Sequence, residues 1–296
     1  MTEAVKNPQF AHNLLAMAHQ DLNAARHLYS GGFYPQAVFY LEQSAEKGLK
    51  SFSIGLGIID EKEARLDISH KTLKIYEKTT KSYRQRIVTL QENLKKIPSL
   101  EAFFNQRLDF GDVAKQLDVS LAQLRALSKQ GDEAMSLSEE DLKKHIKTLN
   151  GLARDSKRAS AKIHKKAISS SDFRATERFL TEMVDAALAD QPERLNQTKN
   201  EVKNKFTFET YEKLTKEILM QSIPPMETFQ SFFQLSIILQ PHAVARYPKS
   251  DFNPVEFYKP DLPLIKSLLK LADITERVLN QVDVFYQKSA EVEYVA

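Results

Sequence analysis

Four polar side chains form the most concentrated group in this chain of 296 residues that could do chemistry. They are Gln43, Glu46, Lys47 and Lys50, which span about two turns of a predicted helix. One interpretation is a solvated face, in which Glu46 and Lys50 form a helical ion pair. The other is a phosphate- or nucleotide-binding patch, because a lysine ammonium offers a point charge to a phosphate. We favour the solvated face, and we expect Asp21 to pair with one of the lysines across a helical hairpin.

A basic segment between residues 141 and 166 is the second candidate. Nine lysines and arginines lie there, opposed only by Asp141 and Asp155. Such a segment suits a phosphate backbone, which contributes affinity without sequence information. The alternative is the solvated face of an ordinary helix. At helical spacing, five of these cations fall on one stripe of the helix, on a different side from the apolar residues. They are Lys147, Arg154, Arg158, Lys162 and Lys165.

Two Arg–His spacings, Arg65 with His70 and Arg158 with His164, could act on a phosphodiester. A histidine can move a proton near neutral pH, and an arginine stabilises charge that develops on a phosphate. With seven histidines in the chain, such spacings also arise by chance and carry little weight alone.

A short segment resembles a DNA-reading motif. Residues 113–125 have the apolar spacing of a helix-turn-helix, with Ser120 as the cap of the second helix. Asp118 stands at the turn, where glycine is usual, and Gln123 and Arg125 would then face the bases. Two short packed helices explain the same spacing.

Helices must position all of these residues. Apolar residues recur at helical spacing over 8–30 and 34–54, and Gly31-Gly32 between them supplies a left-handed stop. A third helix is expected from about Ser69 to Lys96, and the last one from about 262 to 288.

Further helical segments are expected between the third and the last helix. Pro192 and the pair Pro224-Pro225 should separate the later ones, and five prolines make 240–263 an extended connector. The predicted helices lie near 99–108, 111–117, 120–129, 138–167, 171–190, 207–221 and 226–239.

Composition agrees with an all-α fold. Glycine occurs eight times and never after Gly151, which disfavours tight turns and strands in the C-terminal half. The absence of cysteine excludes disulfides and thiolate chemistry, and no cofactor or metal is expected. No apolar run could cross a membrane and no leader is visible, so a cytoplasmic protein is expected. The net charge of +3 does not by itself imply a polyanionic partner.

The hairpin resembles the opening of the HEPN family of small helical bundles. The resemblance rests on the pattern A-x-x-D-L-x-x-A-x-x-L-Y-x-x-G-x-Y-x-x-A-V-F-x-x-x-Q-x-A-E-K-x-L-K within residues 17–50. The sequence from His70 to Leu73 is similar to the family's H-x-x-L, and Arg246-Tyr247-Pro248 to its R-Y-P turn. The resemblance implies an antiparallel bundle built from 1–97 and 240–296, with a large helical insertion over 98–239.

The resemblance also implies functions and partners. Family nucleases carry their Arg–His pair near the last helices, and neither spacing in this chain lies there. We therefore expect a non-catalytic binding or interaction protein, with a metal-independent endoribonuclease and a DNA-binding protein as alternatives. Expected partners are a nucleotide or RNA, a nucleotidyltransferase-type protein in a toxin–antitoxin pair, and a second copy of the chain. Candidate binding residues are Asp21, Gln43, Glu46, Lys47, Lys50, His70 and Arg246.

Two structural predictions follow from the same resemblance. Tyr247 should pack against the bundle, while Arg246 should reach a carboxylate such as Glu46 or Asp21. The apolar residues predicted to be buried in the bundle are Leu22, Ala25, Leu41, Ala45, Leu268, Leu271 and Leu279.

Overall fold

The described part of the chain is helical. In the computed structural model it comprises residues 8–68, 73–95, 115, 118–119, 122, 137–165, 170–243 and 247–293. Apart from one isolated bridge between Lys249 and Phe252, the described residues form helices, turns and loops, which confirms the all-α prediction. Two compact units divide the chain: the first holds residues 1–86, 114–154 and 225–296, and the second holds 87–113 and 155–224.

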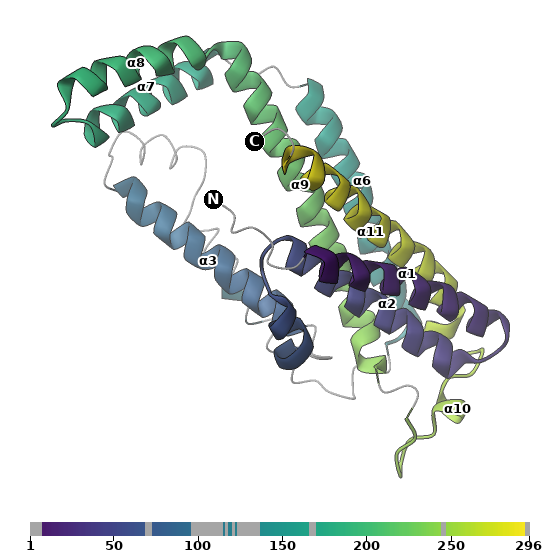
Figure 1. The fold of residues 1–296 in the computed structure, drawn as a ribbon. Coiled ribbons are helices and arrows are strands. Elements are labelled where there is room, and N and C mark those ends of the chain that lie inside the picture. The colour runs from purple at the N-terminus through teal and green to yellow at the C-terminus, as the bar shows by residue number, and fades with distance from the viewer. Residues whose placement is uncertain are drawn as a thin grey trace. The chain divides into compact units, whose positions relative to one another are not determined.

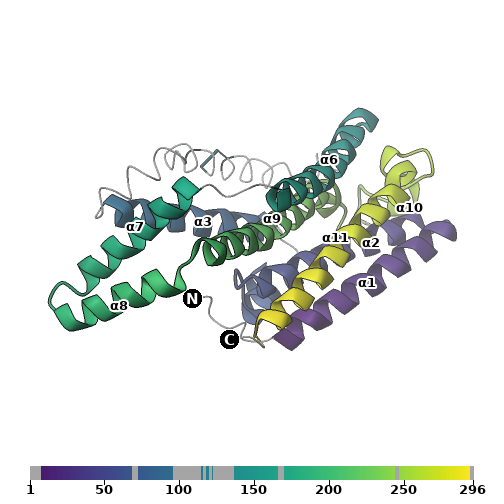
Figure 2. The ribbon, with the colours of Figure 1, turned by 90° about the horizontal axis from the view of Figure 1, so that it is seen from above.

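The first unit is built on a helical hairpin. Helix α1 (Pro8–Ser30) and helix α2 (Tyr34–Gly55) are joined by a turn at Gly31-Gly32. Gly32 has a φ of +78°, the left-handed conformation that the glycine pair predicted, and the Phe33 amide donates to the Leu28 carbonyl at 2.8 Å. Helix α11 (Pro263–Glu293) lies beside both, as Figures 1 and 2 show.

Helix α2 is the central helix of this unit, and most of its residues are buried. Small side chains let its neighbours approach closely. A Cβ added to Gly48 would meet Leu279 of α11 and would lie 3.0 Å from the Phe232 ring. The burial prediction is confirmed for all seven apolar residues, Leu22, Ala25, Leu41, Ala45, Leu268, Leu271 and Leu279.

Polar side chains along α1 set its register against α11. His19 lies 2.9 Å from Asp283. About two helical turns further along α1, Arg26 donates to Asp273 at 2.8 Å and to Glu276 at 2.9 Å. As the residue number rises on α1 it falls on α11, so the two helices are antiparallel. His19 and Arg26 are a heptad apart, which keeps both on the same seam.

Parts of three further helices complete the core of the first unit. They are α3 (Leu73–Lys95), α6 (Glu139–Lys165) and α9 (Phe208–Leu239), and a π-helical turn (η1, Glu63–Ile68) precedes α3. Tyr76 of α3 is buried with its ring centroid 4.9 Å from those of Phe229 and Phe233 on α9.

The boundaries of the compact units differ from those of the expected insertion, residues 98–239. Residues 114–154 and 225–239, which were expected in a separate insertion, belong to the unit that holds the hairpin. The physical reason is that Leu142 and Leu149 of α6 and Phe232 of α9 are buried in the same apolar core as α1 and α2.

The connector before α11 is irregular, as its prolines predicted. It contains a 3₁₀ turn (η3, Gln240–His242) and a short helix α10 (Pro254–Phe257), whose cap is the Asn253 side chain. Tyr247 is 55% exposed, so the prediction that it packs against the bundle is wrong.

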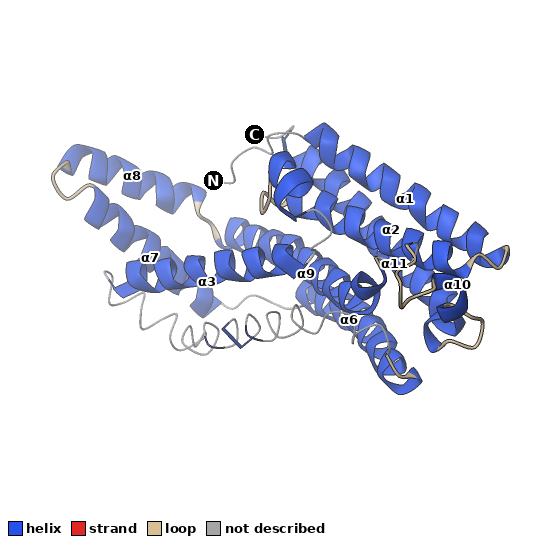
Figure 3. Ribbon diagram, turned by 90° about the horizontal axis from the view of Figure 1, so that it is seen from below, coloured by secondary structure: helices blue, strands red, loops and turns tan. Residues whose placement is uncertain are grey.

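The second unit contains a helical hairpin of α7 (Ser170–Ala187) and α8 (Pro192–Lys205), seen in Figures 1 and 3. Phe173 and Phe206 stack at its base with ring centroids 5.6 Å apart, and Lys199 pairs with Asp185. The sequence pattern did not predict α8, because that helix has no buried residue and hence no apolar stripe.

Helix α9 continues through Pro224-Pro225, where two separate helices were expected. That prediction was wrong, although the boundary between the compact units falls between these two prolines. None of the described helices is long and apolar enough to cross a membrane.

Candidate nucleic-acid interface

The polar cluster of α2 lies inside the first unit. Gln43, Glu46 and Lys50 are each less than a tenth exposed, so the interpretation as a solvated face is wrong. The reason is the central position of α2, which has neighbours on several sides. The periodicity of one helix does not show how many of its faces will be covered.

The members of this cluster bind one another. The Lys50 ammonium lies 2.6 Å from Glu46, so the expected helical pair is present. The Gln43 amide donates to Glu46 at 3.5 Å and to Glu42 at 2.8 Å. Lys47 pairs with Asp21 of α1, which confirms the expected link across the hairpin.

Glu42 is a member of the cluster that sequence reasoning missed. It is only 2% exposed, and burial together with the nearby charge of Glu46 raises the pKa of its carboxyl to about 8. The sequence did contain a sign of this, because Glu42, Glu46 and Lys50 follow one another at intervals of four residues and so lie on the same side of the helix. The cluster therefore holds a buried carboxyl that is protonated at neutral pH.

The basic segment forms a helix whose start is well defined. Ser138 caps α6: its hydroxyl accepts from the Asp141 amide at 3.1 Å. Three acidic residues occupy the first turn, where they complement the positive end of the helix dipole. Leu142 and Leu149 are buried on one face, and Lys143, Lys144 and Lys147 lie at exposed positions.

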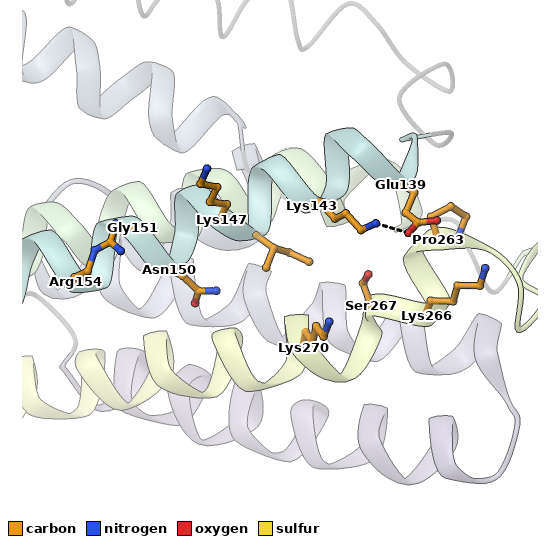
Figure 4. A pocket seen from close by; sticks show the side chains of 11 residues that line it. Glu139, Lys143, Lys147, Asn150, Gly151, Arg154, Pro263, Lys266, Ser267 and Lys270 are labelled. Carbon is orange, nitrogen blue, oxygen red and sulfur yellow. Dashed lines mark ion pairs between the residues drawn. The ribbon is translucent and has the colours of Figure 1, made fainter.

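A groove of about 470 Å³ lies between α6 and α11 in the first unit. Figure 4 shows its two walls. From α6 come Glu139, Lys143, Ile146, Lys147, Asn150, Gly151 and Arg154, and from α11 come Pro263, Lys266, Ser267 and Lys270.

Positive charge dominates the groove. Five of its described lining residues are cations and one, Glu139, is a carboxylate, which gives a net charge of +4. The whole chain has a net charge of only +3. The groove therefore carries more positive charge than the chain as a whole, whose other residues sum to −1, and such a local field attracts anions.

Polar groups are also placed along the walls. Lys143 lies 2.6 Å from Glu139, and this hydrogen bond lowers the pKa of that carboxyl, as does the charge of Lys266. No described ion pair engages Lys147 or Lys270.

The Asn150 side chain is held in one orientation. Arg277 of α11 donates to its Oδ1 and to the Leu149 carbonyl, both at 3.2 Å. Because a guanidinium only donates, the amide oxygen must face Arg277 and the amide nitrogen is left as a donor in the groove (Figure 4). Ser267 points from α11 toward α6 in the same view. The groove thus presents ammonium, amide and hydroxyl donors, which are the groups that bind phosphate oxygens.

The predicted basic stripe is found in part. Lys147 and Arg154 are exposed on α6 and line the groove. The side chains of Arg158, Lys162 and Lys165 lie outside the described residues, although all three positions are helical.

Sequence reasoning missed the second wall of the groove. Lys266 and Lys270 lie more than a hundred residues after α6, and a pair of lysines four residues apart is common on exposed helices. Only the packing of α11 beside α6 makes them part of a site.

The other candidates gain no support from the described residues. His70 and Arg246 lie outside them, as do Gln123 and Arg125. Asp118, expected at the turn of a helix-turn-helix, is helical and lies 2.6 Å from Arg84 of α3.

The described residues do not test the two Arg–His spacings, because His70 lies outside them. Arg65 pairs with Glu61 at 3.1 Å, and the side chains of Arg158 and His164 are outside that part of the structure. Among the described residues, no three acidic or histidine side chains gather to hold a metal ion.

Comparison with known proteins identifies a domain at the start of the chain. Residues 11–156, about half of the chain, match the family model of the HEPN domain. The match covers the hairpin, α3 and the part of α6 that lines the groove. No curated protein and no solved structure matches the chain. The chain therefore contains a HEPN domain over residues 11–156, in agreement with its all-α bundle.

Proposed function

We propose that this HEPN protein binds RNA through the phosphate backbone and does not cleave it. The HEPN domain supports a function related to nucleotides or RNA. The observation that carries the proposal is the groove between α6 and α11, where five cations surround polar donors.

The chemistry of the lining favours a backbone over a free nucleotide. A site for a nucleobase offers aromatic or extended apolar surface on which the base can stack. Among the described lining residues of the groove, only Ile146 and Pro263 are larger apolar residues, and none is aromatic. A phosphate chain needs no such surface, since it is bound by charge and hydrogen-bond donors.

The described lining of the groove does not supply the groups that cleavage requires. Breaking a phosphodiester without a metal needs a group that moves a proton near neutral pH, usually histidine. None of the described lining residues is a histidine. His242, elsewhere in the first unit, is buried, and burial lowers its pKa to about 4, so it is neutral at pH 7.

A charge-removal experiment tests the proposal. The variant K147A/R154A/K270A removes cations from both walls at exposed positions, so it should fold normally. Its affinity for a labelled RNA should fall about tenfold or more, because each exposed charge contact contributes up to about 1 kcal/mol.

The matched control is K203A/K205A/K259A, which removes the same charge from exposed positions that do not line the groove. It should bind like the wild type, and the RNA should stay intact with every protein. Equal losses for the two variants would mean that net charge, and not the groove, governs binding. Cleavage by the wild type would contradict the non-catalytic part of the proposal.

A further inference from the structure

Gly151 is in the interior of α6, where glycine lowers helix stability relative to alanine. A glycine in a helix usually permits a left-handed conformation or the close approach of a neighbour. Of the described glycines, only Gly32 and Gly57 have positive φ. At Gly151 an added Cβ would meet no described heavy atom within 4 Å, in contrast to Gly48. The fold itself therefore gives no reason for glycine at position 151.

The position of Gly151 in the groove supplies a reason. It lines the groove between Lys147, four residues before it, and Arg154, three residues after it. Residues at these spacings are neighbours on a helix surface. The missing side chain leaves a bare stretch of helix backbone flanked by two cations, and next to the Asn150 amide.

The shape of the groove limits what can reach this bare stretch. Its volume of about 470 Å³ is within the roughly 300–1,000 Å³ of small-ligand pockets, so it can hold a short stretch of one extended strand. A duplex, whose grooves alone are about 6–12 Å wide, can only rest on the rim. Lys143 and Lys147 on one wall and Lys266 and Lys270 on the other repeat every four residues, about 6 Å along each axis. Repeated charge on two walls suits a chain of phosphates better than a single anion.

We infer that the groove takes one single-stranded phosphodiester chain, and that this chain passes closest to α6 at Gly151. The inference rests on the proposed RNA-binding function. It adds that the bound RNA is single-stranded, and that Gly151 makes room for it because it has no side chain. No hydrogen bond to the Gly151 backbone is needed, because the amides within a helix are already bonded.

The test places side chains of increasing size at this position. G151A and G151L introduce good helix formers into open space, so both should melt about 1–3 °C above the wild type. Both keep every cation of the groove. Binding of a labelled oligouridylate of about 12 nucleotides should nevertheless weaken, a few-fold for G151A and about tenfold for G151L.

The matched control is T148L, an exposed position of the same helix that does not line the groove. It should bind the oligouridylate like the wild type. A duplex RNA of equal length should bind the wild type more weakly than the single strand does, and its affinity should change little in G151L.

Each other outcome has one meaning. Wild-type binding by G151L, together with lost binding by K147A/R154A/K270A, would overturn the role of Gly151 and leave the proposed function standing. An equal loss for duplex and single strand would overturn the assignment of strandedness. A lower melting temperature for G151A would show that the glycine serves the fold. Wild-type binding by the triple variant would overturn the proposed function itself.

Discussion

At the scale of single residues, Glu42 has the most unusual environment of the described carboxyl groups. It is buried on the central helix beside a second carboxylate, and the Gln43 amide hydrogen-bonds to it. Lys47 and Lys50 pair with Asp21 and Glu46, and their charges offset only part of the effect that burial and Glu46 have on the pKa of Glu42. A buried carboxyl in this position is stable as the neutral acid.

This protonation makes the stability of the fold depend on pH. The pKa of Glu42 rises from 4.5 in the unfolded chain to about 8 in the fold, so the folded state holds a proton that the unfolded state releases. The stabilisation is fully present below pH 4.5 and is lost as the pH rises to about 8. Replacement by glutamine keeps the neutral form at every pH.

We therefore expect Glu42→Gln to change little at pH 5 and to stabilise the protein at pH 8.5 by roughly 4 kcal/mol, since the pKa rises from 4.5 to about 8 and each pKa unit corresponds to about 1.4 kcal/mol. Urea unfolding at both pH values measures this difference. Glu92→Gln, at an exposed position of α3, is the control and should show no such dependence on pH. An equal effect of Glu42→Gln at the two pH values would show that the carboxyl is already ionised in the fold.

At the scale of helices, two interior glycines have opposite roles. A Cβ at Gly48 meets Leu279 and the Phe232 ring, whereas a Cβ at Gly151 meets open space. Gly48→Ala should therefore destabilise the protein by roughly 1–3 kcal/mol, because the added methyl forces α11 or α9 to shift. The free energy of unfolding in urea measures this cost. A variant as stable as the wild type would mean that the packing around α2 yields without penalty.

Helix boundaries could be predicted where a local signal marks them. Proline at the start of α1, the glycine turn and the Ser138 cap each fix an end through groups within a few residues. Helix α8 was not expected, because it has no apolar stripe and none of its residues is buried. The continuation of α9 through Pro224-Pro225 was also missed, because the local penalty of proline does not reveal what the neighbouring turns gain by packing.

At the scale of the whole molecule, the sequence predicted the fold class and half of the candidate site. One wall of the groove was visible because its cations are concentrated in a single helix. Lys266 and Lys270 could not be assigned to it, because no local pattern says that α11 lies beside α6. The polar cluster was misplaced at the surface for a similar reason, since burial of α2 depends on helices far away in sequence.

The central claim is that the two walls of the groove bind a phosphate backbone together. The most direct measurement is the slope of log affinity against log salt for a single-stranded RNA, compared between the wild type and K147A/R154A/K270A. Each phosphate contact on a single strand releases about 0.7 counterion, so the loss of three contacts should reduce the slope by about two units. The control K203A/K205A/K259A should retain the wild-type slope. A slope in the groove variant equal to that of the wild type would contradict the claim, because the cations of the groove would then not be touching phosphate.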